Sequence, residues 1–256
     1  MSSEELLTYM RDVLADAPEG IVTFEQLSDE ETAVIETTDQ SGFTVQPWIE
    51  SQKHLDAASA ALFGRRSLYL RGMLTVGLDP ETGQEALLIS DRLNFIADAR
   101  RLGMGYILAR AHHRGERTAR NNVVQAQIGT YEEDIDTNGF HHLSVCTYRT
   151  AVQRIATWAL PQPHSGDEIR DSIARSRWDR WTGKTLGADA RTVEINVFLS
   201  DGNGDYHASE WLCAHGNGFT VLAESNGKQL NIASTSASRL EYLLGEQLAN
   251  GLGVHV

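Results

Sequence analysis

Basic residues are too scarce in this chain to balance its acids. The 256 residues hold 22 lysines and arginines against 35 aspartates and glutamates, which gives a formal net charge of −13 at pH 7. A surface of this sign repels the phosphates of nucleic acids and the anionic headgroups of a membrane. We therefore expect a protein that is neither a general nucleic-acid binder nor a membrane-docking protein.

Cysteines and long apolar runs are scarce as well. Two cysteines do not make a disulfide scaffold in a chain of this length. No run approaches the roughly 18 apolar residues that indicate a membrane-spanning helix. The first residues include Glu4, Glu5 and Asp12 and lack the basic and then apolar layout of a signal peptide. The expected location is cytoplasmic.

The chain does contain a weak internal repeat with an offset of about 88 residues, its copies running from about 90 to 161 and from about 166 to 250. Under this offset Tyr106–Ala109 aligns with Glu194–Val197, and Asn138-Gly139 aligns with Asn226-Gly227. Two copies are too few for a solenoid. We predict a single domain over residues 1–256 with a pseudo-twofold axis, the first half covering about 20–161 and the second about 164–250.

Turn residues indicate how the strands of the second half pair. Predicted strands at 192–200, 207–215, 218–225 and 228–233 are separated by Asn203-Gly204, Asn217-Gly218 and Asn226-Gly227. Asn-Gly pairs favour type I′ hairpin turns, and the short gaps leave no room for crossover helices. The predicted fold class is therefore α+β, with a central, mostly antiparallel sheet and flanking helical bundles.

Apolar spacing and turn chemistry predict the remaining elements. Helices are expected at 3–15, 29–37, 52–71, 90–102, 150–160, 167–181 and 236–248, strands at 106–113, 123–131 and 140–148, and a loop at 75–85.

Histidine and cysteine are the candidates for catalysis. His112-His113 and His141-His142 lie at predicted strand ends, but adjacent residues on a strand point to opposite faces, so a three- or four-ligand zinc site is not expected. Cys146 and Cys213 lie among apolar residues, as buried structural cysteines do. A dyad of Cys213 with His215, which shares its strand face, stays open. We predict no catalytic, cofactor-binding or metal-binding residue and no enzyme.

Two acidic clusters are interpreted as solvated features. Glu132-Glu133-Asp134 is assigned to a hairpin loop, and Asp29-Glu30-Glu31 to the first turn of a helix capped by Ser28. The glycine-rich turns around Asn203 and Asn217 join strand to strand, which does not fit a nucleotide-binding loop.

One basic stretch stands out in the acidic chain, from Arg110 to Arg120. Arginine is enriched at protein interfaces, and loops on a rigid sheet commonly carry recognition. We predict partner binding by the loop at 114–121 and the sheet beside it, or else by the helix around two tryptophans. The candidate residues are His113, Arg114, Arg117, Arg120, Trp178 and Trp181.

The order of elements and several local patterns resemble the EspG family, the secretion-associated chaperones of actinobacterial type VII (ESX) systems. The resemblance runs from about Leu27 to Leu248. It is carried by Leu27-Ser28-Asp29-Glu30 and the helix after it, His54 to Leu74, Asp91 to Arg110, Trp158-Ala159-Leu160-Pro161, Arg191 to Ile195, His215-Gly216-Asn217-Gly218 and the final helix. It implies a quasi-twofold antiparallel sheet, and a client-facing loop at 114–121.

The resemblance further implies a cytoplasmic chaperone or adaptor that binds PE–PPE protein pairs and keeps them soluble for export. Two other classes stay open from the residues alone. One is a general protein-binding or regulatory module, and the other is an enzyme with an unrecognised site built on histidine and cysteine.

Overall fold

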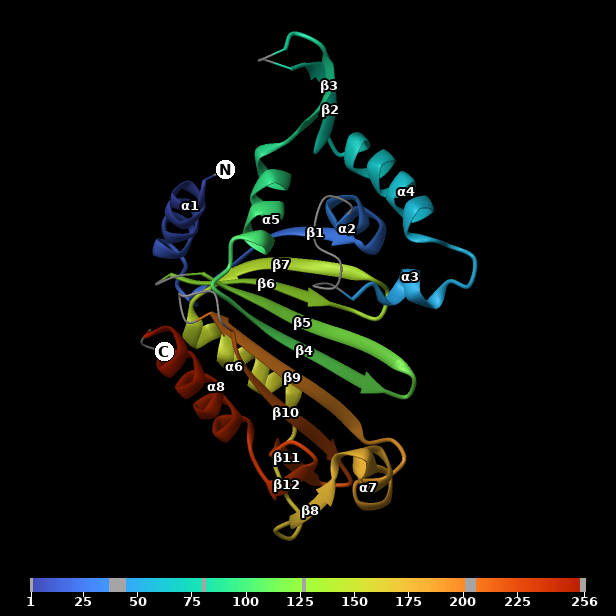
Figure 1. Ribbon diagram of the computed structural model, residues 1–256, viewed down its shortest axis with the longest axis vertical. Coiled ribbons are helices and arrows are strands. Elements are labelled where there is room, and N and C mark those ends of the chain that lie inside the picture. Colours follow the sequence, from blue (N-terminus) through green and yellow to red (C-terminus); the bar gives the residue numbers. More distant parts are fainter. Residues whose placement is uncertain (1, 37–44, 80–81, 126–127, 201–205, 254–256) are drawn as a thin grey trace.

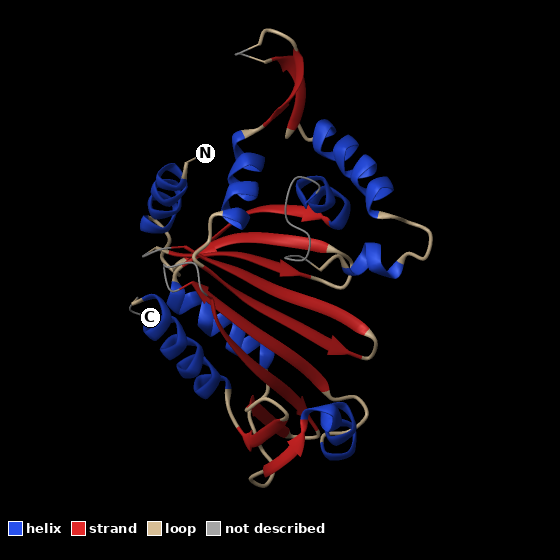
Figure 2. Ribbon diagram, in the orientation of Figure 1, coloured by secondary structure: helices blue, strands red, loops and turns tan. Residues whose placement is uncertain are grey.

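The computed structural model describes residues 2–36, 45–79, 82–125, 128–200 and 206–253. Most of its strands form one ten-stranded sheet, and every neighbouring pair in it is antiparallel. Figure 1 shows helices on both faces of this sheet and a separate two-stranded hairpin that projects beyond it. Figure 2 shows the same arrangement by element type.

The sheet has the strand order β1-β7-β6-β5-β4-β9-β10-β11-β12-β8, and β2 pairs with β3 in the hairpin. The strands are β1 (Ile21–Ser28), β2 (Leu74–Leu78), β3 (Glu85–Ile89), β4 (Gly105–His113), β5 (Glu116–Gln125), β6 (Gly129–Ile135), β7 (Phe140–Cys146), β8 (Arg170–Ala174), β9 (Arg191–Ser200), β10 (Tyr206–Gly216), β11 (Phe219–Ser225) and β12 (Gln229–Ser234). The helices are α1 (Ser3–Ala15), α2 (Asp29–Glu36), α3 (Pro47–Ser51), α4 (Ala57–Leu70), α5 (Asp91–Arg101), α6 (Tyr148–Ala159), the 3₁₀ turn η1 (Arg175–Arg177), α7 (Trp178–Thr185) and α8 (Ala237–Leu252).

The two halves of the sheet are related by a pseudo-twofold axis between β4 and β9. Each half contributes a helix, four antiparallel strands and a second helix, and the remaining strand of each half lies at the outer edge as β1 or β8. Leu108 lies opposite Asn196, the residue that the offset of 88 assigns to it. The predicted fold class is confirmed. The predicted single domain and its half boundaries stay predictions.

The two faces of the sheet carry different apolar cores because strand residues alternate between faces. On one face α6 and α8 pack on the central strands, around Ile107, Ile195 and Leu244. On the other face α1, α4 and α5 pack over the first half, around Phe95, Tyr131 and Leu143. A third core lies where Trp178 and Leu186 meet β10, β11 and β12.

Four predicted elements of the chain are wrong. Residues 123–131 do not form one strand, because β5 ends at Gln125 and β6 begins at Gly129. Residues 167–181 are not one helix, because Arg170–Ala174 pairs with β12 as the edge strand and only then does a helix begin. In both places sheet pairing outweighs local pattern.

The other two corrections concern the region before α5. Residues 75–85 are not an open loop, since they include parts of both strands of the β2–β3 hairpin. Residues 52–71 are not one helix, since α3 ends at Ser51 and Asp56 caps a new helix by accepting a hydrogen bond from the backbone N–H of Ser59. A single apolar stripe across 52–71 concealed this break.

The predicted Asn-Gly turns have different outcomes. Asn217 and Gly218 both have positive φ, 49° and 81°, as a type I′ turn requires. At Asn226-Gly227 only the glycine has positive φ, so the turn differs from the one predicted. Asn203-Gly204 lies outside the described residues.

The contact between α2 and α4 depends on a glycine. A Cβ added to Gly64 would lie 1.9 Å from the backbone oxygen of Glu30, so only hydrogen allows the two helices to approach this closely. We expect Gly64→Ala to lower the free energy of unfolding by about 1–3 kcal/mol through overpacking, although alanine is favoured by about 1 kcal/mol in an unconstrained helix. Urea denaturation measures the change.

Gly183→Ala in α7 is the matched control, because a Cβ there meets nothing within 4 Å. It should leave the protein unchanged or stabilise it by up to about 1 kcal/mol. Equal effects of the two substitutions would contradict the close α2–α4 crossing.

Candidate functional site

A buried ionic network lies where α2, α5, β6 and β7 meet. Glu133 of β6 is fully buried, and Arg100 of α5 donates two hydrogen bonds to its carboxylate, from Nε to Oε1 at 2.5 Å and from Nη2 to Oε2 at 3.0 Å. The Tyr131 hydroxyl donates a third at 2.8 Å. Burial works to raise the pKa of Glu133, but Arg100 and His141 outweigh it and lower that pKa to about 2.

His141 of β7 extends this network to α2. Its Nε2 lies 2.8 Å from Oδ1 of Asp29, and its Nδ1 lies 3.5 Å from Oε2 of Glu133, a charge contact too long for a good hydrogen bond. Burial works to lower the pKa of His141, yet the contacts with Asp29 and Glu133 prevail and raise it. A protonated imidazole between two carboxylates, with Arg100 nearby, makes the four charges balance.

The first turn of α2 connects the sheet to the helices above it. Asp29 Oδ2 accepts hydrogen bonds from the backbone N–H groups of Trp48 at 2.7 Å and Ile49 at 3.1 Å, which hold α3. Glu31, also buried, accepts from Ser67 Oγ and Arg71 Nη1 of the α4 region, both at 2.6 Å. The predicted capping box is present, since the backbone N–H of Ser28 donates to Oε2 of Glu31 at 3.1 Å and that of Glu31 donates to Oγ of Ser28 at 3.4 Å. Its solvated character is wrong, because Asp29 and Glu31 are buried.

The interpretation of Glu132-Glu133-Asp134 as a solvated loop is wrong as well. All three lie within β6, and Glu132 is fully buried beside Arg154 of α6, whose Nη2 is 2.8 Å from Oε1. The two neighbouring glutamates point to opposite sheet faces and meet arginines from different helices. Each buried charge thus has a partner, as burial requires.

Exposed apolar side chains gather on the helices and hairpin that this network supports. We call them the apolar arm. Leu70 is 78% exposed and Leu78 is 69% exposed. The arm comprises Leu62, Phe63, Tyr69 and Leu70 of α4 and Val76, Leu78, Leu87, Leu88 and Ile89 of the β2–β3 hairpin. Figure 1 shows both elements at one end of the molecule, with the hairpin projecting away from the sheet. A concentration of this kind marks an interaction surface.

The predicted basic loop is a tight two-residue turn, because Arg114 and Gly115 both have positive φ and β5 begins at Glu116. Arg114 pairs with Asp189 at 3.2 Å, and Arg117 pairs with Glu50 of α3 at 2.9 Å. Both pairs are exposed, so they hold the side chains only weakly. The turn and the start of β5 therefore contact elements of both halves along one rim of the sheet.

The other predicted partner-binding residues are placed differently. Arg120 is buried, pairs with Asp134 and lies over the Trp158 ring, so it supports the sheet. Trp178 is buried and stacks on Trp181 with ring centroids 5.9 Å apart, although Trp181 stays half-buried. His113 is half-buried next to the basic turn.

Chemistry at the histidines and cysteines is unfavourable for catalysis. Burial raises the pKa of Cys213 to about 12, while burial and the neighbouring Arg191 and His113 lower that of His215 to about 4. At neutral pH the thiol is protonated and the imidazole is neutral, so neither is activated. Cys146 is likewise buried, with a raised pKa. His113 and His141 do not meet, because β5 and β6 separate their strands.

Among the described residues no three histidine, cysteine, aspartate or glutamate side chains converge as a metal site would need. Within the same ranges no helix has the length and apolar character needed to cross a bilayer.

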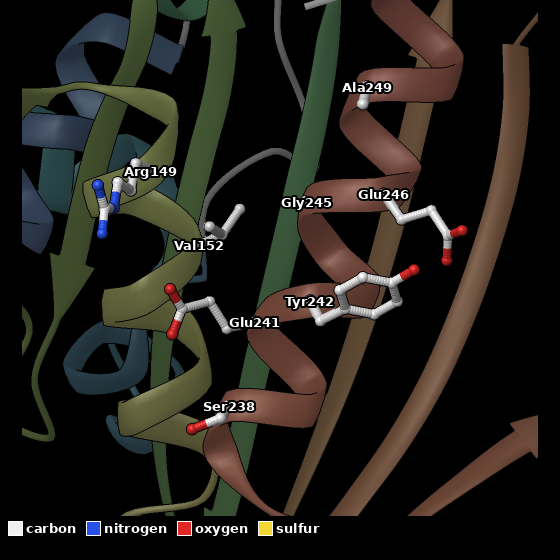
Figure 3. Close-up of a pocket in the computed structure, with 8 residues that line it drawn as sticks. All are labelled: Arg149, Val152, Ser238, Glu241, Tyr242, Gly245, Glu246 and Ala249. Atoms are coloured by element: carbon white, nitrogen blue, oxygen red, sulfur yellow. The ribbon is translucent and has the colours of Figure 1, made fainter. Parts of the chain in front are cut away.

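A groove of about 670 Å³ lies between α6 and α8 (Figure 3). These helices cover the sheet face opposite to that covered by α1, α4 and α5. In this view Val152 and Glu241 point into the space between the two helices, while Tyr242 and Glu246 lie on the outer side of α8. Gly245 and Ala249 contribute little side chain, which leaves space for the groove. Its lining is mixed in charge, with Arg149 from α6 and Glu241 and Glu246 from α8.

Together these features define an α+β protein built on a pseudo-twofold antiparallel sheet, with an apolar arm inserted in its first half. A solved structure with this fold is that of the Mycobacterium tuberculosis type VII secretion system chaperone EspG5 in complex with a PE25–PPE41 dimer. The match has a TM-score of 0.52 at 6% sequence identity and covers 89% of this chain and 96% of that one. The predicted resemblance to EspG is thus confirmed at the level of the fold. No family model and no curated protein matches the sequence.

The buried Arg100–Glu133 pair leads to a stability prediction. Glu133→Gln leaves Arg100 and His141 buried with one carboxylate fewer, so we expect a loss of about 3 kcal/mol or more in unfolding free energy near neutral pH. Glu116→Gln, at the exposed start of β5, should change it by less than about 0.5 kcal/mol. Equal stability of the two variants in denaturant titrations would contradict the assigned pair.

The pH dependence of this effect has a definite sign. The pKa of Glu133 is near 2 in the folded chain against an ordinary 4.5, so its contribution is complete above pH 4.5 and is lost as the pH falls toward 2. Glu133→Gln should therefore show a shallower loss of stability over that acidic range than the parent chain. A parallel loss would show that other carboxylates account for the acid sensitivity.

Proposed function

We propose that this protein is a cytoplasmic chaperone or adaptor that binds a helical client of the PE–PPE type and keeps it soluble for type VII export. The observation that carries the proposal is the apolar arm, exposed on a fold shared with a chaperone solved together with a PE25–PPE41 dimer. The identity of 6% leaves function to be argued from this chain's own surface.

The arm has the composition of a binding surface for an apolar helix face. Aromatic side chains such as Phe63 and Tyr69 commonly supply the central anchors of interfaces, and aliphatic neighbours exclude water around them. Burying such side chains gains roughly 25 cal/mol per Å² of apolar area. Because Gly64 and Glu31 fix α4 on α2, the arm is held before a client arrives, which lowers the ordering cost of binding.

The basic turn would contribute at the rim. Arg114 and Arg117 are exposed. Their partners Asp189 and Glu50 are exposed too, so these ion pairs hold the arginines only weakly. In a chain of net charge −13, two such arginines form a local site for an acidic client surface. Rim charges of this type mainly affect the association rate and its salt dependence.

Calorimetry with a purified PE–PPE pair tests the proposal. We expect the triple change Leu62→Ser, Phe63→Ser and Leu70→Ser to weaken binding by about 100-fold or more, since anchor residues contribute about 2 kcal/mol each. Tyr242→Ser on α8 is the control, because Tyr242 is 56% exposed, similar to Phe63 at 62%, and belongs to another face. Loss of binding by the control alone would place the client on α8.

The basic turn has its own test against the same client. Arg114→Ala with Arg117→Ala should slow association several-fold and reduce its dependence on salt, with little change in dissociation. Arg120→Ala is no measure of docking because that arginine is buried. An association rate unchanged at low salt would remove the turn from the interface.

A further inference from the structure

Helices α2, α3 and α4 share an apolar cluster of their own. Ala33, Ile49, Ala60 and Ala61 form it, with Trp48 and Leu55 at its border. This cluster is distinct from the larger core over the sheet, which Leu68 of α4 joins. A segment with its own small core behaves as a cooperative unit that opens before the rest of a protein does.

Asp29 is the buried charged attachment of this unit to the sheet, beside the apolar contacts of Val34 and Leu68 with the larger core and the Arg71–Glu25 pair to β1. The backbone N–H of Asp29 donates to Gly139 O at 2.8 Å, and its side chain contacts His141 Nε2 while also holding the start of α3. A Cβ at Gly139 would lie 2.6 Å from Trp48 Cβ and 2.7 Å from Asp29 Cγ, so β7 and the unit are in close contact here.

We propose that His141 is a protonation-controlled latch, which holds the α2–α4 unit on the sheet when charged and lets it open when neutral. The charged and titratable groups that face the imidazole are Asp29 from α2, Glu133 and Tyr131 from β6, and Arg100 from α5. From α3 only backbone N–H groups reach Asp29.

Charge counting gives the direction of the switch. With His141 protonated, two carboxylates face two cations, and both imidazole nitrogens carry a proton toward an acid. After deprotonation one carboxylate loses its N–H donor and the buried network has one uncompensated negative charge, which is costly at this depth. His141 has a raised pKa, so its contribution is complete below about pH 6.5 and is lost as the pH rises through the folded-state value.

The latch affects the apolar arm because α4 carries four of the residues of the arm. Opening of the unit would move Leu62, Phe63 and Leu70 relative to the sheet and change the surface available to a partner. The latch is a property of the free chain, so it can hold or fail independently of the proposed function.

Hydrogen exchange of the full chain, followed by mass spectrometry at about pH 6 and about pH 9, tests the latch. After correction for intrinsic rates, we expect amides of α2, α3 and α4 to open about tenfold more at the higher pH, while amides of β9 and β10 do not change. His141→Gln should open to the high-pH extent at both values. His142→Gln, the exposed neighbour on the opposite face, should behave as the parent chain does.

Protection of the α2–α4 unit that is equal at the two pH values in the parent chain would overturn the latch. So would a His141→Gln protein that keeps the parent's pH dependence, because another group would then control the opening. If His141→Gln does not fold, the comparison of the parent chain at the two pH values still decides.

Discussion

The interaction on which the rest of the structure depends is the buried chain of charges from Asp29 through His141 and Glu133 to Arg100. It joins four elements: the first turn of α2, the paired strands β6 and β7, and helix α5. Buried charges are costly unless each finds a partner, so the four groups tolerate little rearrangement and fix these elements relative to one another. Glu31, in the same turn of α2, holds α4 in place by accepting hydrogen bonds from Ser67 and Arg71.

The pseudo-twofold sheet explains why this region carries the exposed apolar side chains of the proposed binding surface. In the second half, only the short turn η1 lies between the edge strand β8 and the helix α7. In the first half, α2, α3, α4 and the β2–β3 hairpin occupy the equivalent place between β1 and α5. The symmetric part supplies a rigid sheet with a core on each face, and the asymmetric insertion supplies the exposed apolar side chains. Fold and proposed binding surface therefore lie on different parts of the chain.

Sequence reasoning recovered the symmetric part because its signals are local. Asn-Gly turns, alternating strands and capped helices act over a few residues, and the offset of 88 places Leu108 opposite Asn196. The anchoring acids were missed because a run of acidic residues is typical of a solvated loop. In the structure Glu132 and Glu133 lie on one strand and point to opposite faces, where each pairs with an arginine distant in the sequence. The alternation of Tyr131, Glu133 and Ile135 was the available signal. The edge strand β8 has no such signal in the sequence, because only its pairing with β12 makes it a strand.

A double-mutant cycle between Asp29 and His141 tests the central claim most directly. The free energy of unfolding is measured near pH 6 for the parent chain, Asp29→Asn, His141→Gln and the combined variant. We predict a coupling energy of about 2 kcal/mol, at the high end of the range for residues in one network. A coupling below about 0.5 kcal/mol, the level of independent sites, would show that the two groups lie side by side without holding α2 to the sheet.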